Sequence, residues 1–164
     1  LADCNGKDAL ISILRSRIAW RDSRFGHDNV DTASLLDQLA RIRSGRNQLS
    51  LAVPLFRRAF ATREQFLGWG DVRTLASATS LGLLLERTGD LQEAEDVLRR
   101  VLTHRTKKFG AAHPDTIGSL GNLALLHRQS GNSSEFGQLF QRCHNLCQNI
   151  VSQGRGNALD CLAS

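Results

Sequence analysis

The strongest constraint on the fold of this chain is a sequence pattern that returns every 42 residues. Identical residues recur at that spacing in three triplets: Gly26, Gly68 and Gly110; Thr32, Thr74 and Thr116; Leu39, Leu81 and Leu123. A fixed period between about 20 and 50 residues is typical of a stacked array of repeats, in which each unit buries its apolar face against its neighbours. Such an array usually presents a surface to a partner and carries out no chemistry itself.

Each copy predicts two helices joined by a short turn, which we call helix A and helix B. Helix A is expected to begin near Asn29, Asp71 or His113, and Pro114 then falls at a first helical position, where its missing N–H costs nothing. The turn to helix B is expected at residues that tolerate a left-handed backbone, namely Gly45 to Asn47, Gly89-Asp90 and Gly131-Asn132.

Residue size also follows the period, and it predicts how the helices pack. Small residues recur at one position of helix A, where they are Ala40, Gly82 and Ala124, and at one position of helix B in two copies, as Ala52 and Ala94. Large residues recur at a second position of helix B, where they are Phe56, Leu98 and Phe140. Alternating small and large positions are what interdigitated helix packing requires, so we expect all of them to be buried.

The repeat unit resembles a tetratricopeptide repeat. Copy two shows the resemblance as Leu81-Gly82, then Gly89, then Glu93-Ala94, and the loop from Phe109 to Thr116 together with the 42-residue length is similar to the longer kinesin light chain-type repeat. Copy one departs from the pattern, with Leu51 where Glu is usual and Pro54 inside its helix B. The resemblance implies an all-α, right-handed α-solenoid of antiparallel helix pairs, with about three full repeats and partial repeats at both ends.

The period divides residues 1–164 as a single array. Residues 1–24 are expected to form a half repeat (a helix B), residues 25–66, 67–108 and 109–150 three repeats, and residues 151–164 the start of a further repeat. Because neither end resembles the polar cap that a solenoid needs, we expect a segment of a longer array, or one whose ends dock on neighbours.

In the family that the chain resembles, helices A line a concave groove that holds a partner. The position two residues before the small one is Gln38, Ser80 and Asn122; in the kinesin light chain-type family an Asn of an N-L-A motif faces the peptide there, and Asn122 alone matches it. Solvated polar residues are the alternative interpretation. The residues expected to line the groove, with Asp37 beside them, are Gln38, Arg41, Ser80, Leu83, Arg87, Asn122, Leu125, Arg128 and Gln129.

The cysteines and histidines near the C-terminal end do not predict a metal site. Cys143 occupies a repeat position that holds small core residues in the other copies. This favours a buried, unreactive thiol over a metal ligand that acts together with His127 and Cys147. A disulfide between Cys147 and Cys161 would form if a final helix packed back on the array. We expect no metal, no cofactor and no catalytic residue, because the sequence contains no triad order, no phosphate-binding loop and no H-E-x-x-H motif.

The net charge of +5 comes mostly from arginines interleaved with acidic residues, which does not favour nucleic-acid binding. The basic run from Arg99 to Lys108 can be explained by the dipole of its helix, with an acidic partner or an anionic membrane surface as the alternative. No apolar stretch is long enough for a transmembrane segment. The compartment is not predicted: the cytoplasm, or an organelle after removal of a targeting segment, would both fit.

We therefore expect a non-catalytic scaffold or adaptor that binds a protein or peptide partner through its concave face. A structural or assembly subunit of a large organellar complex is the first alternative; it would contact several subunits by its ends or convex face. An accessory domain of a larger signalling protein or enzyme is the second.

Overall fold

The computed structural model describes residues 2–26 and 29–152, which form seven α-helices. No strand occurs within these residues. The helices fall into two compact units, Leu1–Thr88 and Gly89–Ser164. The all-helical content agrees with the expectation from the 42-residue pattern.

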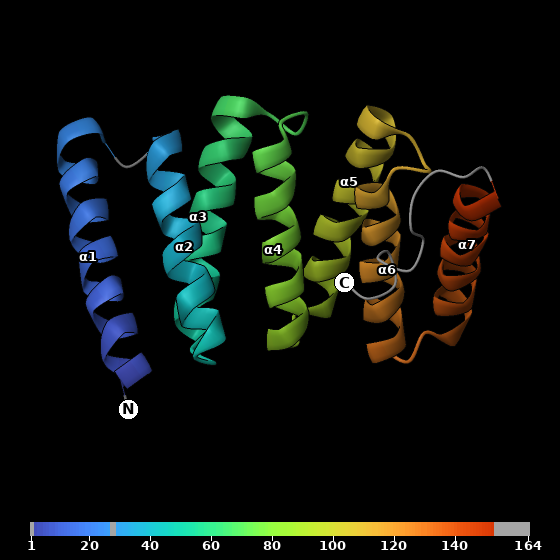
Figure 1. Cartoon of the computed structure of the whole chain (residues 1–164), viewed down its shortest axis with the longest axis horizontal. Coiled ribbons are helices and arrows are strands. Elements are labelled where there is room, and N and C mark those ends of the chain that lie inside the picture. Colours follow the sequence, from blue (N-terminus) through green and yellow to red (C-terminus); the bar gives the residue numbers. More distant parts are fainter. Residues whose placement is uncertain (1, 27–28, 153–164) are drawn as a thin grey trace. The chain divides into compact units, whose positions relative to one another are not determined.

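The first unit contains α1 (Ala2–Phe25), α2 (Val30–Gly45), α3 (Leu49–Leu67) and α4 (Val72–Thr88). Each helix packs against the next one along the chain, as the blue and green ribbons of Figure 1 show. Where α1, α2 and α3 meet, the core consists of aliphatic residues from one face of each helix: Ile11, Leu14, Ile18, Ala33, Leu35, Leu36, Leu39 and Ala59. Pro54 lies inside α3 without ending it.

The second unit contains α5 (Leu91–Phe109), α6 (Pro114–Gln129) and α7 (Ser133–Ser152), with α6 packed against both of the others. Arg99 of α5 joins the three helices: its Nε lies 2.7 Å from Glu95, and its Nη2 lies 3.6 Å from Glu135 on α7. The same Nη2 lies 3.4 Å from Nε2 of His127, a buried histidine of α6.

The beginnings of α2, α4 and α6 confirm the predicted capping residues. Asn29 Oδ1 accepts a hydrogen bond from Asp31 N (2.9 Å), Asp71 Oδ1 accepts one from Arg73 N (2.8 Å), and His113 Nδ1 accepts one from Asp115 N (3.2 Å). Each bond satisfies an N–H group that has no partner within the helix. Pro114 occupies the first turn, as expected.

The repeated glycines end the helices. Gly68 and Gly110 follow α3 and α5 with φ angles of 69° and 88°, values that residues with a Cβ rarely adopt. The turns between helices A and B also contain glycines with positive φ angles, 90° at Gly89 and 76° at Gly131. In copy one the equivalent residue is Asn47, with φ 58°, so the predicted segment from Gly45 to Asn47 turns at its last residue.

The predicted small positions are buried in all three copies of helix A and at both alanines of helix B. At the large position, Phe56 and Leu98 are buried, but Phe140 is 52% exposed, so that part of the prediction was wrong. The buried face of α7 is formed by Leu139, Cys143 and Cys147 instead. Because neighbouring residues on a helix are about 100° apart, burying Leu139 turns Phe140 away from α6, and its ring contacts Phe136 (5.7 Å between centroids).

Cys143 is buried, as its small-residue position predicted, and its Sγ lies 3.8 Å from the carbonyl oxygen of Ile117. The predicted disulfide partner Cys161 lies outside the described residues, so the Cys147–Cys161 pairing stays a prediction. Among residues 2–26 and 29–152, no group of three or more His, Cys, Asp or Glu side chains is placed to hold a metal ion. Likewise, none of the described helices is long and apolar enough to cross a membrane.

Candidate functional site

The predicted groove residues of the first unit share one face of α2 and of α4. Gln38 and Arg41 are one turn apart on α2, and Ser80, Leu83 and Arg87 follow one another at helical spacing on α4. Gln38, Arg41 and Arg87 are exposed, and the other two are half-buried. We call this set the α2/α4 face.

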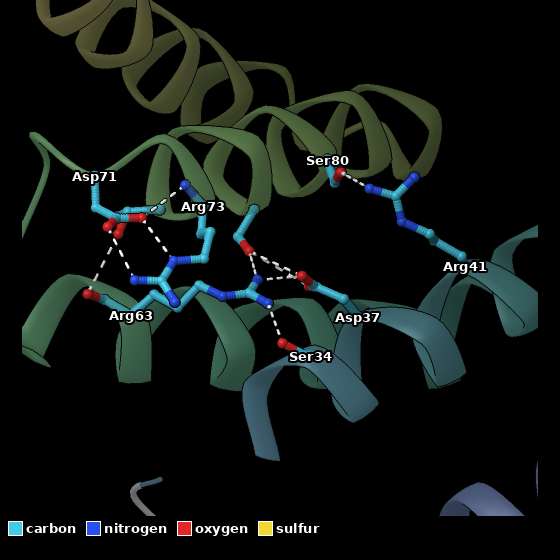
Figure 2. Close-up of polar contacts among 9 residues, drawn as sticks. Ser34, Asp37, Arg41, Arg63, Asp71, Arg73 and Ser80 are labelled. Carbon is cyan, nitrogen blue, oxygen red and sulfur yellow. Dashed lines mark hydrogen bonds and ion pairs between the residues drawn. The ribbon is translucent and has the colours of Figure 1, made fainter. Parts of the chain in front are cut away.

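Two arginines connect the two helices across this face. Arg41 Nη2 donates to Ser80 Oγ over 3.5 Å, at the right of Figure 2. Arg87 Nη1 donates to Ser44 Oγ over 2.6 Å, and its Nη2 lies 3.5 Å from the carbonyl oxygen of the same serine. Within the described residues, neither Arg41 nor Arg87 forms an ion pair with a carboxylate.

Beside the α2/α4 face lies a polar cluster centred on the buried Arg63 of α3. Its side chain is 6% exposed and forms an ion pair with Asp37 of α2, whose side chain is 15% exposed. Arg63 Nη1 also donates to Ser77 Oγ of α4, and Nη2 donates to Ser34 Oγ of α2 over 3.2 Å (Figure 2). We call Ser34, Asp37, Arg63 and Ser77 the Arg63 cluster.

The side chains of the cluster are hydrogen-bonded to one another and to the backbone. Ser77 Oγ donates to Asp37 Oδ2 over 3.1 Å while it accepts from Arg63, and Thr74 Oγ1 donates to the Arg63 carbonyl oxygen over 3.3 Å. One buried atom, Arg63 Nε, has no partner among the residues that the structure describes. A buried charge costs free energy unless it is paired and hydrogen-bonded, and the three helices together provide those partners.

The start of α4 places a further ion pair at the edge of this region. Arg73 Nε lies 3.1 Å from Asp71 Oδ1 in the left part of Figure 2, and more than half of the Arg73 side chain is exposed. Because this pair is largely solvated, it contributes little to stability. Its hydrogen bonds to Asp71 raise the pKa of the Arg73 guanidinium.

The remaining predicted residues lie on α6 in the second unit. Asn122, Leu125 and Gln129 follow one face of that helix, and Arg128 lies beside Gln129. Asn122 is half-buried, whereas Leu125, Arg128 and Gln129 are exposed. The structure thus brings together the predicted residues of α2 and α4, while those of α6 form a separate set.

Sequence reasoning named Asp37 only as a neighbour of the groove and missed Arg63 altogether. A signal was available, because Arg21, Arg63 and Arg105 are 42 residues apart. Arg105 of α5 repeats part of the arrangement: its Nη1 donates to Ser119 Oγ over 2.8 Å, and Ser119 is the residue 42 positions after Ser77. A charged residue recurring at the period of a core pattern indicates a role inside the stack.

Two surface hollows are lined by none of the predicted groove residues. One follows α1 and is lined by Asp8, Ile11, Ser12, Arg15, Ser16 and Ala19. The other follows α7 and is lined mainly by amide side chains, including Gln138, Gln141, Asn145 and Asn149. Neither hollow was predicted from the 42-residue pattern.

Comparison of the sequence with models of known protein families identifies the family. Two models, both described as tetratricopeptide repeat, match residues 32–71 and 73–149. The chain belongs to the tetratricopeptide-repeat family. This confirms the resemblance drawn from Leu81, Gly89 and Ala94 and gives the chain the α-solenoid fold, which generally serves as a non-catalytic scaffold for protein partners.

Solved structures with a similar fold come from kinesin light chain-like repeats. A Podosopora anserina structure described as putative kinesin light chain nearly identical TPR-like repeats, and a single-residue variant of that protein, each show a TM-score of 0.79 and 22% identity. Those matches cover 92% and 93% of this chain and 71% of the other chain. BtubC (BKLC) from P. vanneervenii shows a TM-score of 0.79 and 17% identity over 89% of this chain and 58% of the other. A search of curated proteins finds no match.

Proposed function

We propose that this tetratricopeptide-repeat protein binds a partner segment on its α2/α4 face. The observation that carries the proposal is the pair Arg41 and Arg87, two exposed arginines on one face whose guanidinium groups hydrogen-bond only to serines among the described residues. Each guanidinium retains donors for the carbonyl or carboxylate groups of an incoming chain.

The other side chains of the face complement the arginines. Gln38 offers an amide that can bond both the N–H and the C=O of a passing backbone, and Leu83 offers an apolar contact between Ser80 and Arg87. A segment with carboxylates spaced to meet Arg41 and Arg87 would gain charge-assisted hydrogen bonds at both. The preferred partner is therefore an acidic protein segment with an apolar residue between its acidic ones.

The second unit has a candidate surface of its own on α6. Asn122 matches the backbone-binding Asn of the family motif, and Arg128 adds a third exposed guanidinium. These α6 residues are tested separately from those of α2 and α4.

The test begins with a peptide selected for binding to the natural chain from a random peptide library. Its dissociation constant is then measured by calorimetry for the natural chain, for Arg41→Ala with Arg87→Ala, and for Asn122→Ala with Arg128→Ala. The first pair should weaken binding about tenfold or more, since a hydrogen bond to a charged group contributes about 1.5–3 kcal/mol. A loss of affinity in the second pair would show that the α6 surface also binds the peptide.

The control removes the same charge elsewhere. Arg57→Ala with Arg100→Ala takes two exposed arginines from α3 and α5, outside the proposed face, and should leave the dissociation constant within about twofold of the natural value. If both arginine pairs weaken binding equally, net charge and not the α2/α4 face is responsible, and the proposal is wrong.

Exposed apolar residues on α1 favour a second candidate function. In this function the chain is a subunit that docks on other proteins through the outer surfaces of its helices. Leu10, Ile13 and Trp20 are 43%, 55% and 58% exposed and lie at helical spacing on one side of that helix. Exposed apolar residues grouped on one helix often mark a protein–protein contact.

The two functions give opposite results in a pull-down that uses the whole chain as bait. A docking subunit loses its captured proteins when Ile13→Ser and Trp20→Ser are combined and keeps them when Arg41 and Arg87 become alanine. A segment-binding scaffold behaves the other way round.

A further inference from the structure

The Arg63 cluster reaches both helices that carry the α2/α4 face. We propose that Arg63 is a positioning residue: its guanidinium sets the separation and rotation of α2 and α4, so that the face is already shaped before a partner arrives. This inference rests on the proposed function. Arg63 does not itself meet the partner, because its side chain is 6% exposed.

The geometry of the cluster is suited to that task. A guanidinium is planar and carries its donors in a fixed fork, so partners on two helices must lie in set directions from it. Arg63 uses this fork on Asp37 and Ser34 of α2 and on Ser77 of α4 (Figure 2). The Ser77 to Asp37 hydrogen bond, 3.1 Å long, then joins α2 to α4 directly.

The positions of these partners transmit the constraint to the face. Asp37 immediately precedes Gln38 and is one turn before Arg41, and Ser77 is one turn before Ser80. Moving α4 relative to α2 would break the bonds at Asp37 and Ser77 and would also change the 3.5 Å separation of Arg41 Nη2 and Ser80 Oγ. A face fixed in this way avoids part of the ordering cost of binding.

The test must separate positioning from stability. Arg63→Met, Asp37→Leu and Ser77→Ala together replace the buried polar groups of the cluster with apolar ones, a change that often leaves stability nearly unaltered because no charge is left buried and unpaired. The matched control, Arg58→Met with Asp22→Leu, removes another ion pair of α3 (2.6 Å), one that joins it to α1 and not to the α2/α4 face.

The probe is the library-selected peptide described above, and each variant is measured for both its thermal midpoint and its dissociation constant. The triple variant should keep its midpoint within about 4 °C of the natural chain and bind the peptide about tenfold more weakly. The control should bind normally. Arg63→Lys, which keeps the charge but not the fork, should recover only part of the affinity.

Three results would overturn the inference. A folded triple variant that binds the peptide as tightly as the natural chain would show that Arg63 does not position the face. Suppose instead that the triple variant and the control both lose affinity, and that each loss comes with a lower thermal midpoint. Arg63 would then have a purely structural role. If no peptide can be selected, or if Arg41→Ala with Arg87→Ala leaves binding intact, the proposed function fails first and the inference fails with it.

Discussion

At the scale of single residues, the buried thiol of Cys143 shows how packing alters chemistry. Burial raises the pKa of this thiol to about 11, with the nearby Cys147 acting in the same direction. Since the thiolate is the reactive form, we expect Cys143 to resist alkylation at pH 8 in the folded chain and to react once the chain is unfolded in urea. Mass spectrometry of the alkylated peptides would measure both; rapid labelling of folded Cys143 would contradict its burial.

The same pKa predicts a pH dependence of stability. In the unfolded chain the thiol loses its proton at a pKa near 9, whereas in the folded chain it holds the proton up to about 11. Above pH 9 the unfolded state therefore binds fewer protons, so the free energy of unfolding should fall as the pH rises from 9 to 11. Urea titrations of the natural chain and of Cys143→Ala should show a steeper fall for the natural chain.

Single residues also show where sequence reasoning was sufficient. Asn29, Asp71 and His113 could be predicted as caps because capping depends on a side chain and the backbone within a few residues of it. Arg63 could not be placed in the same way, because its partners Asp37 and Ser77 lie 26 and 14 residues away and come together only when three helices pack. That the polar side chains of the α2/α4 face bind a partner remains a prediction.

At the scale of elements, the glycines that end the helices differ from the glycines within them. Gly110 follows α5 with φ 88°, whereas Gly121 lies inside α6 in an ordinary helical conformation, and an added Cβ would meet open space at both. Gly110→Ala should therefore destabilise the chain by about 1–3 kcal/mol through backbone strain alone. Gly121→Ala should stabilise it by about 0.5–1 kcal/mol. Chemical denaturation of both variants measures the contrast, and equal effects would contradict it.

The helix bounds themselves were largely predictable, since caps and turn residues recur in register in each copy. The rotation of α7 was not. Phe140 occupies the position of the buried Phe56 and Leu98, yet Leu139 is buried in its place. Both residues are apolar and adjacent, so hydrophobic periodicity alone does not decide which of them faces α6.

At the scale of the whole molecule, net charge should influence binding. The chain carries +5, and the proposed face presents Arg41 and Arg87 to an acidic segment. Raising the salt concentration from about 0.05 M to about 0.5 M should weaken binding of an acidic library-selected peptide by about three- to tenfold, mostly by slowing association. Stopped-flow measurements test this; an association rate that is independent of salt would exclude electrostatic recognition on this face.

The buried arginine at the position of Arg63 limits which helices can be exchanged between copies of the repeat. Arg63 finds a carboxylate at Asp37, but the residues 42 and 84 positions later are Thr79 and Gly121, so only one copy supplies that counter-charge. Exchanging helix A of copy one for that of another copy would leave a guanidinium buried without its anion, despite the matching length and caps. The copies are therefore not interchangeable modules, because a few charged side chains need partners that only one copy provides.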